Sequence, residues 1–244
     1  MYRERRSLVD GAVVWTHGTM PDGEGRVLPD GCMDLLLWDG ALVVAGPDTR
    51  AHLFTRAAGS RMTGLRLPPG TGPLVFGVPA HELRDRRVPL GELWPSAAVR
   101  VLEERIAEAP AAGRALESIA AERLAGREPL PSGEVAELLA RGRGVASVAR
   151  ALGLSERQLH RRCLDAFGYG PKTLARVLRM QGALRLAARG MPPAQVAAVA
   201  GYADQAHLSR EVRALAGATL RELSPQGSGA NRSTPLPSGS ATTA

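Results

Sequence analysis

The sequence predicts an α+β protein with a β-rich N-terminal domain over residues 1–95, a helical linker over 96–132 and an all-α C-terminal domain over 133–224. Short apolar runs bounded by turn residues dominate the first part, and apolar residues at helical spacing begin near residue 96. One helix-pair pattern then occurs twice. The 244 residues are enough for two domains of ordinary size. The Ser/Thr/Gly/Pro-rich segment 225–244 predicts a disordered tail.

The N-terminal domain is predicted as short strands joined by tight turns. Its strongest signal is Asp39-Gly40, a dipeptide that favours a two-residue hairpin and lies between two apolar runs. Pro68-Pro69-Gly70 ends an alternating run. The strands expected are residues 12–15, 34–38, 41–45, 61–67 and 74–78.

Residues 96–127 predict two helices rather than one, because Pro110 and Gly113 interrupt the helical spacing of the apolar residues. Residues 96–140 hold eight acidic and five basic side chains, and this acidic balance suits a linker or a dimer face better than a DNA contact. Pro129 and Pro131 mark the boundary with the next domain.

The C-terminal domain is organised around a helix-turn-helix pattern over residues 145–168. Gly153 supplies a residue that tolerates positive φ just past the first helix. Ser155 can cap the second helix, and Gln158 three residues later completes a capping box. Apolar residues at helical spacing form the inner faces: Val145, Val148, Ala149 and Leu152 in the first helix, and Leu159, Cys163 and Phe167 in the second.

The same pattern returns over residues 194–217. Gly201 takes the place of the turn glycine, and Asp204 takes the place of the capping residue. Leu208, Val212 and Leu215 form the apolar face of the second helix. Two such units with a helix between them, beginning at Pro171 and ending near Gly190, are difficult to explain by chance.

The polar faces of the two second helices are the candidate DNA-reading surfaces. Arginine can contact guanine through O6 and N7, and glutamine can pair with adenine. Side chains that contact phosphate position a protein on DNA without specifying sequence. We predict base contacts by Arg157, His160, Arg161, Gln205, Ser209 and Arg210, and backbone contacts by Lys172, Arg176 and Arg213.

The positive charge of the chain is concentrated on the first unit and the helix that follows it. The net charge is +7, and residues 141–189 hold eleven basic and two acidic side chains. Such a local excess is the electrostatic footprint of phosphate binding. We therefore expect the first unit to supply most of the DNA affinity.

Residues 134–224 resemble the DNA-binding domain of AraC/XylS-type transcription regulators. The matching features are the ALGLSERQL turn, the run from Gly168 to Pro171, Arg179 and Ala183 in the linking helix, and the segment GYADQAHLSREVR. Val212 departs from the family pattern, which has an aromatic residue there. The resemblance implies two helix-turn-helix units joined by a long helix.

Two N-terminal segments, RVLPDGCMDLLL and VPAHELRDRRVPLGELWP, resemble an uncharacterised domain often found ahead of AraC-type DNA-binding domains. The family resemblance implies that this domain senses a small molecule or dimerises the protein. Candidate polar groups are His17, Asp30, Cys32, Asp34, His52 and His81. The alternative is that Asp30 and Gly31 form a turn, Cys32 is a core residue and the histidines lie on the surface. A redox or alkylation role for Cys32 is a further hypothesis.

Several classes of protein are not favoured by the sequence. No apolar run is long enough for a transmembrane helix, and the N-terminus lacks the pattern of a signal peptide, so we expect a cytoplasmic protein with no membrane partner. Cys32 and Cys163 cannot make a four-ligand structural metal site, and we expect neither metal nor cofactor. The sequence has no nucleophile elbow, phosphate loop or His-Glu metal motif, so we do not expect an enzyme.

The sequence thus predicts a sequence-specific, DNA-binding transcriptional regulator that reads the major groove with two helix-turn-helix units and is controlled through its N-terminal domain. Double-stranded DNA is the expected partner, and a small-molecule effector, RNA polymerase and a second copy of the chain are candidates. The alternatives are a nonspecific nucleic-acid-binding protein, a structural dimer with an incidental basic face, and an enzyme active in the N-terminal domain.

Overall fold

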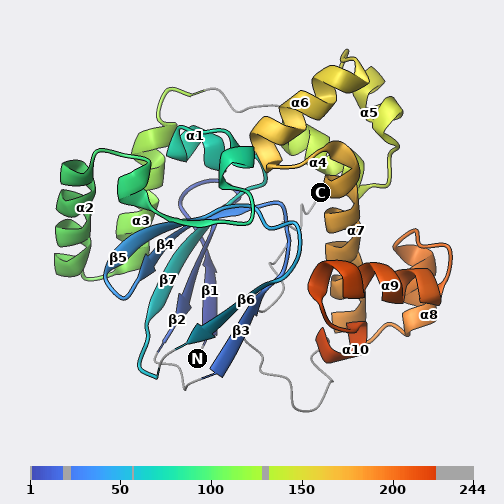
Figure 1. Ribbon diagram of the computed structural model, residues 1–244, viewed down its shortest axis with the longest axis horizontal. Helices are drawn as coiled ribbons and strands as arrows, with labels where there is room; N and C mark the ends of the chain where they lie inside the picture. The colour runs from blue at the N-terminus through green and yellow to red at the C-terminus, as the bar shows by residue number, and fades with distance from the viewer. Residues whose placement is uncertain (1, 19–22, 57, 128–131, 224–244) are drawn as a thin grey trace.

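A computed structural model describes residues 2–18, 23–56, 58–127 and 132–223, whose arrangement is shown in Figure 1. An antiparallel sheet with accompanying helices forms the N-terminal part, and a helical part follows it. The predicted α+β fold class is confirmed. The predicted tail at 225–244 and the prolines of the predicted boundary lie outside the described residues.

The main sheet of the described residues has six strands in the order β1-β2-β7-β4-β5-β8, and all neighbours are antiparallel. β3 and β6 form a separate antiparallel ribbon. Asp39 and Gly40 have φ values of 46° and 92° at the β4–β5 turn, so the predicted hairpin is confirmed. The strands are β1 (Tyr2–Arg6), β2 (Val13–His17), β3 (Gly23–Val27), β4 (Met33–Trp38), β5 (Ala41–Ala45), β6 (His52–Arg56), β7 (Met62–Leu67) and β8 (Arg87–Pro89).

Both faces of the main sheet are covered. Successive residues of a strand point to opposite sides, so each strand contributes side chains to two separate clusters. Leu35 and Leu65 are fully buried in a core that they share with α2 (Ser96–Glu108) and α3 (Ala112–Leu124), which lie beside the sheet in Figure 1. On the other side, Leu36 and Met62 share a smaller cluster with Phe54 of the ribbon. The two helices predicted within residues 96–127 are present, and they pack on the sheet.

One of the strands predicted from sequence is wrong. Residues 74–78 were expected to be extended, but most of them belong to α1 (Gly72–Phe76). Pro73 lies in the first turn, where its missing N–H is not needed, and Gly77 ends the helix with a φ of 82°. An apolar run this short does not distinguish a strand from a helix. Two short 3-10 helices follow, η1 (Ala80–Leu83) and η2 (Leu90–Glu92).

The helical part surrounds one continuous core that includes Leu159, Cys163, Leu174 and Leu208, all fully buried. α7 is its central element, with 18 residues and therefore a length of about 27 Å. The helices are α4 (Ser132–Ala140), α5 (Val145–Ala151), α6 (Glu156–Phe167), α7 (Pro171–Ala188), α8 (Pro193–Val199), α9 (Gln205–Ala216) and α10 (Leu220–Leu223). Within the described ranges, every helix is too short or too polar to cross a lipid bilayer.

The local signals that defined the two helix pairs are confirmed. Ser155 accepts a hydrogen bond from the backbone of Gln158, whose side chain accepts one from the backbone of Ser155, so the capping box is complete. Asp204 caps α9 by accepting from the backbone N–H of His207. Gly153 and Gly201 have φ values of 66° and 75° at the two turns.

Candidate functional site

The first helix pair, α5 and α6, presents an exposed polar face. Leu159 and Cys163 are fully buried and fix the inner side of α6. Arg157, His160 and Arg161 are exposed on the same helix. The three side chains that the sequence assigned to base contacts in this unit therefore share one accessible helix, as a recognition helix requires.

The second helix pair, α8 and α9, has the same construction. Leu208 and Val212 are fully buried, while the candidate DNA-contacting residues Gln205, Ser209, Arg210 and Arg213 are exposed. The hydroxyl of Ser209 donates a hydrogen bond of 2.9 Å to the carbonyl oxygen of Gln205, so it is held along its own helix.

The two pairs lie toward opposite ends of α7, with α6 near its start and α9 beside its later turns (Figure 1). The length of α7, about 27 Å, is comparable to the roughly 34 Å between successive major grooves on one face of DNA. This arrangement suits the simultaneous contacts that the sequence predicts.

Two arginines of α7 hold the second unit in place. Arg176 donates two hydrogen bonds to Glu211 of α9, at 2.8 and 3.0 Å, and this pairing raises the pKa of the arginine and lowers that of Glu211. The guanidinium of Arg179 lies 4.7 Å from the centre of the Tyr202 ring. Arg176, which we predicted as a phosphate contact, is thus already bound within the protein, whereas Lys172 at the start of α7 is exposed.

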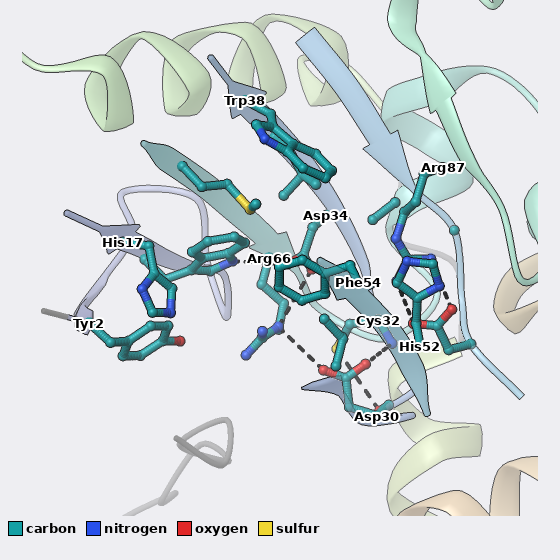
Figure 2. Close-up of a pocket in the computed structure, with 17 residues that line it drawn as sticks. Tyr2, His17, Asp30, Cys32, Asp34, Trp38, His52, Phe54, Arg66 and Arg87 are labelled. Atoms are coloured by element: carbon teal, nitrogen blue, oxygen red, sulfur yellow. Dashed lines mark hydrogen bonds and ion pairs between the residues drawn. The ribbon is translucent and has the colours of Figure 1, made fainter. Parts of the chain in front are cut away.

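A second candidate site lies in the N-terminal domain. Five of the six candidate polar groups, His17, Asp30, Cys32, Asp34 and His52, line one pocket (Figure 2). The sixth, His81, lies elsewhere, with its Nδ1 atom 3.5 Å from the carboxylate of Asp165 on α6.

Sequence reasoning missed the other side chains in this pocket. Tyr2, Trp15, Trp38, Phe54 and Arg66 all line it, and they come from five different strands. Arg66 lies in the alternating run 61–67, which predicted a strand. The run did not indicate which residues of the neighbouring strands would surround Arg66. Such a site depends on tertiary pairing and has no local signal.

The electrostatics of the pocket do not favour a reactive thiol. Burial, together with the nearby carboxylate of Asp30, raises the pKa of the Cys32 thiol well above its ordinary value. A protonated thiol is a poor nucleophile, so the redox hypothesis for Cys32 has no support here. In the part of the chain that the structure describes, no three His, Cys, Asp or Glu side chains are grouped to hold a metal ion.

Comparison with known families now assigns the helical part. Residues 148–225 match a family model described as "Helix-turn-helix domain", and this match spans α6 to α10. The C-terminal part of this chain is an AraC-type helix-turn-helix domain. A separate match, "Domain of unknown function (DUF6597)", covers residues 12–89. An AraC-type domain of this kind supports assignment as a DNA-binding transcription regulator.

No curated protein matches the sequence. Similar solved structures include ToxT from Vibrio cholerae, with 10% identity over 92% of this chain and 96% of that chain and a TM-score of 0.46. Wild-type ToxT with a bound unsaturated fatty acid has 12% identity over 89% and 96% of the two chains, with a TM-score of 0.47. Scores below 0.5 do not establish a shared fold, so these structures add nothing to the assignment.

The N-terminal domain contacts the AraC-type domain at the C-terminal ends of α6 and α9. Arg84 donates a hydrogen bond of 3.3 Å to the carbonyl of Gly168, which caps α6. The backbone N–H of Ala51 donates one of 2.7 Å to the carbonyl of Leu215 in the last turn of α9. Arg26 donates to the next carbonyl, that of Ala216. The placement of α6 and α9 therefore depends on the N-terminal domain as well as on α7.

Proposed function

We propose that this protein is a sequence-specific transcription regulator that inserts α6 and α9 into the major groove of DNA, under the control of its N-terminal domain. The observation that carries the proposal is the pair of capped, outward-facing helices at the two ends of α7. The positive charge over residues 141–189 supports it, because a basic surface around the first unit attracts phosphate.

The exposed side chains suggest a division of roles. Arg157 and Arg161 are suited to guanine, and Gln205 is suited to adenine. Lys172 and Arg213, exposed near the ends of their helices, are suited to phosphate. His160, Ser209 and Arg210 complete the two exposed faces. Arg176 instead keeps α9 in position through Glu211.

Control through the N-terminal domain follows from its contacts with both recognition helices. A rearrangement near Arg84 or Ala51 would reach the ends of α6 or α9 directly. A change in their relative placement would alter how well the two helices fit one stretch of DNA. A small molecule, a second copy of the chain or RNA polymerase could each act through this contact.

Selection of bound fragments from genomic DNA, followed by footprinting, tests the proposal. A specific regulator should prefer its recovered site over random duplexes by about a thousandfold or more at physiological salt. Arg157→Ala and Arg161→Ala should each weaken that binding by about 1–3 kcal/mol and relax the sequence choice locally. Arg100→Ala, an exposed arginine on α2, serves as the control. Equal affinity for every duplex would instead identify a nonspecific nucleic-acid-binding protein.

A further inference from the structure

The pocket of the N-terminal domain lies between the main sheet and the β3–β6 ribbon. The empty space between its side chains and the adjoining open solvent together measure about 800 Å³. The chain has nine Phe, Trp and Tyr residues, and four of them, Tyr2, Trp15, Trp38 and Phe54, line this one pocket. In a sequence this poor in aromatic residues, such a concentration indicates a binding surface.

The four aromatic rings belong to the small apolar cluster on the second face of the sheet, and they also form a wall of the pocket. Tyr2 stacks on Trp15 with 6.2 Å between ring centres, and Trp38 meets Phe54 edge-on at 6.3 Å. His52 stacks on Phe54 at 6.4 Å. Figure 2 labels the rings of Tyr2, Trp38, His52 and Phe54, and it shows Arg66 joined by dashed lines to Asp30 and Asp34. Ring faces of this kind attract cations as well as flat apolar groups.

Two glycines make room for this wall. A Cβ on Gly25 would lie 2.3 Å from the ring of Phe54, and one on Gly64 would lie 2.2 Å from the ring of Trp15. A side chain larger than that of glycine at position 25 or 64 would therefore displace the ring beside it.

Carboxylates outnumber cations at the polar end of the pocket. The side chain of Arg66 is only 8% exposed, and its nitrogens lie 3.3 Å from Asp30, 3.5 Å from Asp34 and 3.8 Å from Glu4. Of these three carboxylates, Asp30 and Asp34 line the pocket, so two carboxylates meet one guanidinium there. Arg87 is committed to Asp48, with two hydrogen bonds of 2.7 and 2.9 Å, so it does not offset this excess.

The polar end is also incompletely satisfied. The buried Nε and Nη1 atoms of Arg66 have no hydrogen-bond partner among the described residues, although both are near carboxylate oxygens. Burial raises the pKa of the Asp30 carboxyl, because its ionised form has lost its hydration. The unsatisfied N–H groups are donors and call for an acceptor, so they do not bear on the charge of the ligand. The preference for a cation rests on the two lining carboxylates, Asp30 and Asp34, that meet one guanidinium.

We propose that this pocket binds a small organic cation, an amine carried on a flat apolar body, with the amine at Asp30 and Asp34 and the body against Trp38 and Phe54. The binding claim rests on the pocket alone. Its consequence for transcription rests on the proposed function above.

The pocket is joined directly to the AraC-type domain. Asp30 and Cys32 line it. Pro29, the residue before Asp30, accepts a hydrogen bond of 2.6 Å from Gln181 of α7. Gly31, which lies between the two lining residues, is next to Leu174 of α7. A ligand that moves this loop therefore moves residues in contact with the linking helix.

A second connection follows the loop after β5. His52 lines the pocket, and its neighbour Ala51 donates a hydrogen bond to Leu215 in the last turn of α9. The linking helix α7 and the second unit are thus each in direct contact with a residue next to the pocket lining. An amine in the pocket should consequently change the DNA affinity of the full chain.

Three probes that share a phenyl ring and differ in charge test the ligand class. They are the cation 2-phenylethylamine, the neutral 2-phenylethanol and the anion phenylacetate. Binding to the full chain is measured by calorimetry and by tryptophan fluorescence, since Trp15 and Trp38 line the pocket. We expect the amine to bind about tenfold or more tightly than the alcohol, and phenylacetate not to bind. Tighter binding of phenylacetate, or no binding of the amine at millimolar concentration, would overturn the proposal.

Asp34→Asn is the matched variant, because asparagine keeps an oxygen that can accept from Trp15 Nε1, the bond that Asp34 makes at 2.9 Å. This variant should weaken binding of the amine about tenfold and leave binding of the alcohol unchanged. Asp10→Asn, an exposed turn residue, removes the same charge elsewhere and should change neither. If Asp34→Asn does not fold, Asp30→Asn should weaken binding of the amine more than binding of the alcohol, because it removes the other carboxylate placed at the amine. Its amide oxygen can still accept from the backbone N–H of Cys32, as Asp30 does at 2.9 Å. Equal losses for both probes would contradict the cation site.

DNA binding is measured separately, with and without 2-phenylethylamine. A change in affinity for the recovered site would support both proposals. Amine binding with no effect on DNA would leave the pocket assignment intact and count against control through the N-terminal domain. Absence of specific DNA binding, with the amine still bound, would overturn only the proposed function.

Discussion

At the scale of single residues, Glu117 is a buried carboxylate that fastens β1 to α3. Arg5 donates two hydrogen bonds of 2.8 Å to it, and the backbone N–H of Leu8 donates a third of 2.8 Å. These bonds lower the pKa of Glu117 from 4.5 to about 2. Because the pKa of the folded state lies below that of the unfolded state, the stabilisation is fully present above about pH 4.5 and is lost as the pH falls toward 2.

Replacing this carboxylate should therefore have a pH-dependent effect. Glu117→Gln is expected to lower the free energy of unfolding by about 2–3 kcal/mol at neutral pH, since it leaves Arg5 without its partner. The difference from the parent chain should shrink below pH 4.5. Urea denaturation over a pH series measures it, with the exposed Glu122→Gln on the same helix as control. A difference that is constant with pH would show that the loss comes from packing alone.

Lys172 tests the distinction between phosphate contacts, which position a protein on DNA, and base contacts, which select the sequence. As a phosphate contact it should act alike on all sequences, so Lys172→Ala should weaken specific and random duplexes equally and reduce the salt slope by about 1. Arg161→Ala should instead change the preferred sequence. Binding isotherms at several salt concentrations distinguish the two effects. A change of sequence preference on loss of Lys172 would move it to the base-reading group.

At the scale of elements, α7 contains a glycine that the structure does not need. The nearest atom to a Cβ on Gly182 is the Nη2 of Arg185 at 3.9 Å, so alanine fits without displacement. Gly182→Ala should raise the free energy of unfolding by about 0.5–1 kcal/mol, because alanine favours a helix. Thermal unfolding measures the gain. Gly64→Ala should have the opposite sign, since its Cβ would collide with Trp15. A loss of stability in both would indicate that α7 tolerates no Cβ at this position.

Elements with local signals were predicted correctly from sequence. Asp39-Gly40 can form the hairpin turn whatever surrounds it, and Ser155 and Gln158 cap α6 within four residues of each other. The strands β1, β3, β6 and β8 were not predicted. The sequence of β1, Tyr2–Arg6, is mostly charged, and that of β3, Gly23–Val27, contains two glycines. Their extended form comes from pairing with distant segments, which propensity does not reveal.

The same contrast holds for the two candidate sites. The exposed arginines of α6 follow from helical periodicity, so Arg157 and Arg161 could be assigned from the sequence to one face. The pocket could not be assembled in this way. Asp30 and His52 were candidates on residue type alone, but the burial of Arg66 and its place between Asp30 and Asp34 require the strand order of the sheet.

At the scale of the whole molecule, the two domains share a buried hydrogen bond. Gln181 is 3% exposed, and its Nε2 donates to the carbonyl oxygen of Pro29 at 2.6 Å. The pocket loop and α7 are therefore fixed to each other at a point where water is excluded. Loss of a buried bond of this kind removes about 1 kcal/mol and leaves a carbonyl without its donor. The domains should then separate more readily while each keeps its own core.

Gln181→Met tests this coupling, because methionine retains much of the volume and removes the donor. We expect faster hydrogen exchange at the Ala51 amide, which bonds to Leu215 across the same interface, and a fall of about 1–2 kcal/mol in the free energy of unfolding. Gln205→Met makes the same chemical change at an exposed position of α9 and should alter neither quantity. Exchange by mass spectrometry or NMR resolves the amide. If stability falls while exchange at Ala51 is unchanged, the bond stabilises only the loop around Pro29, and the two contacts with the AraC-type domain act independently.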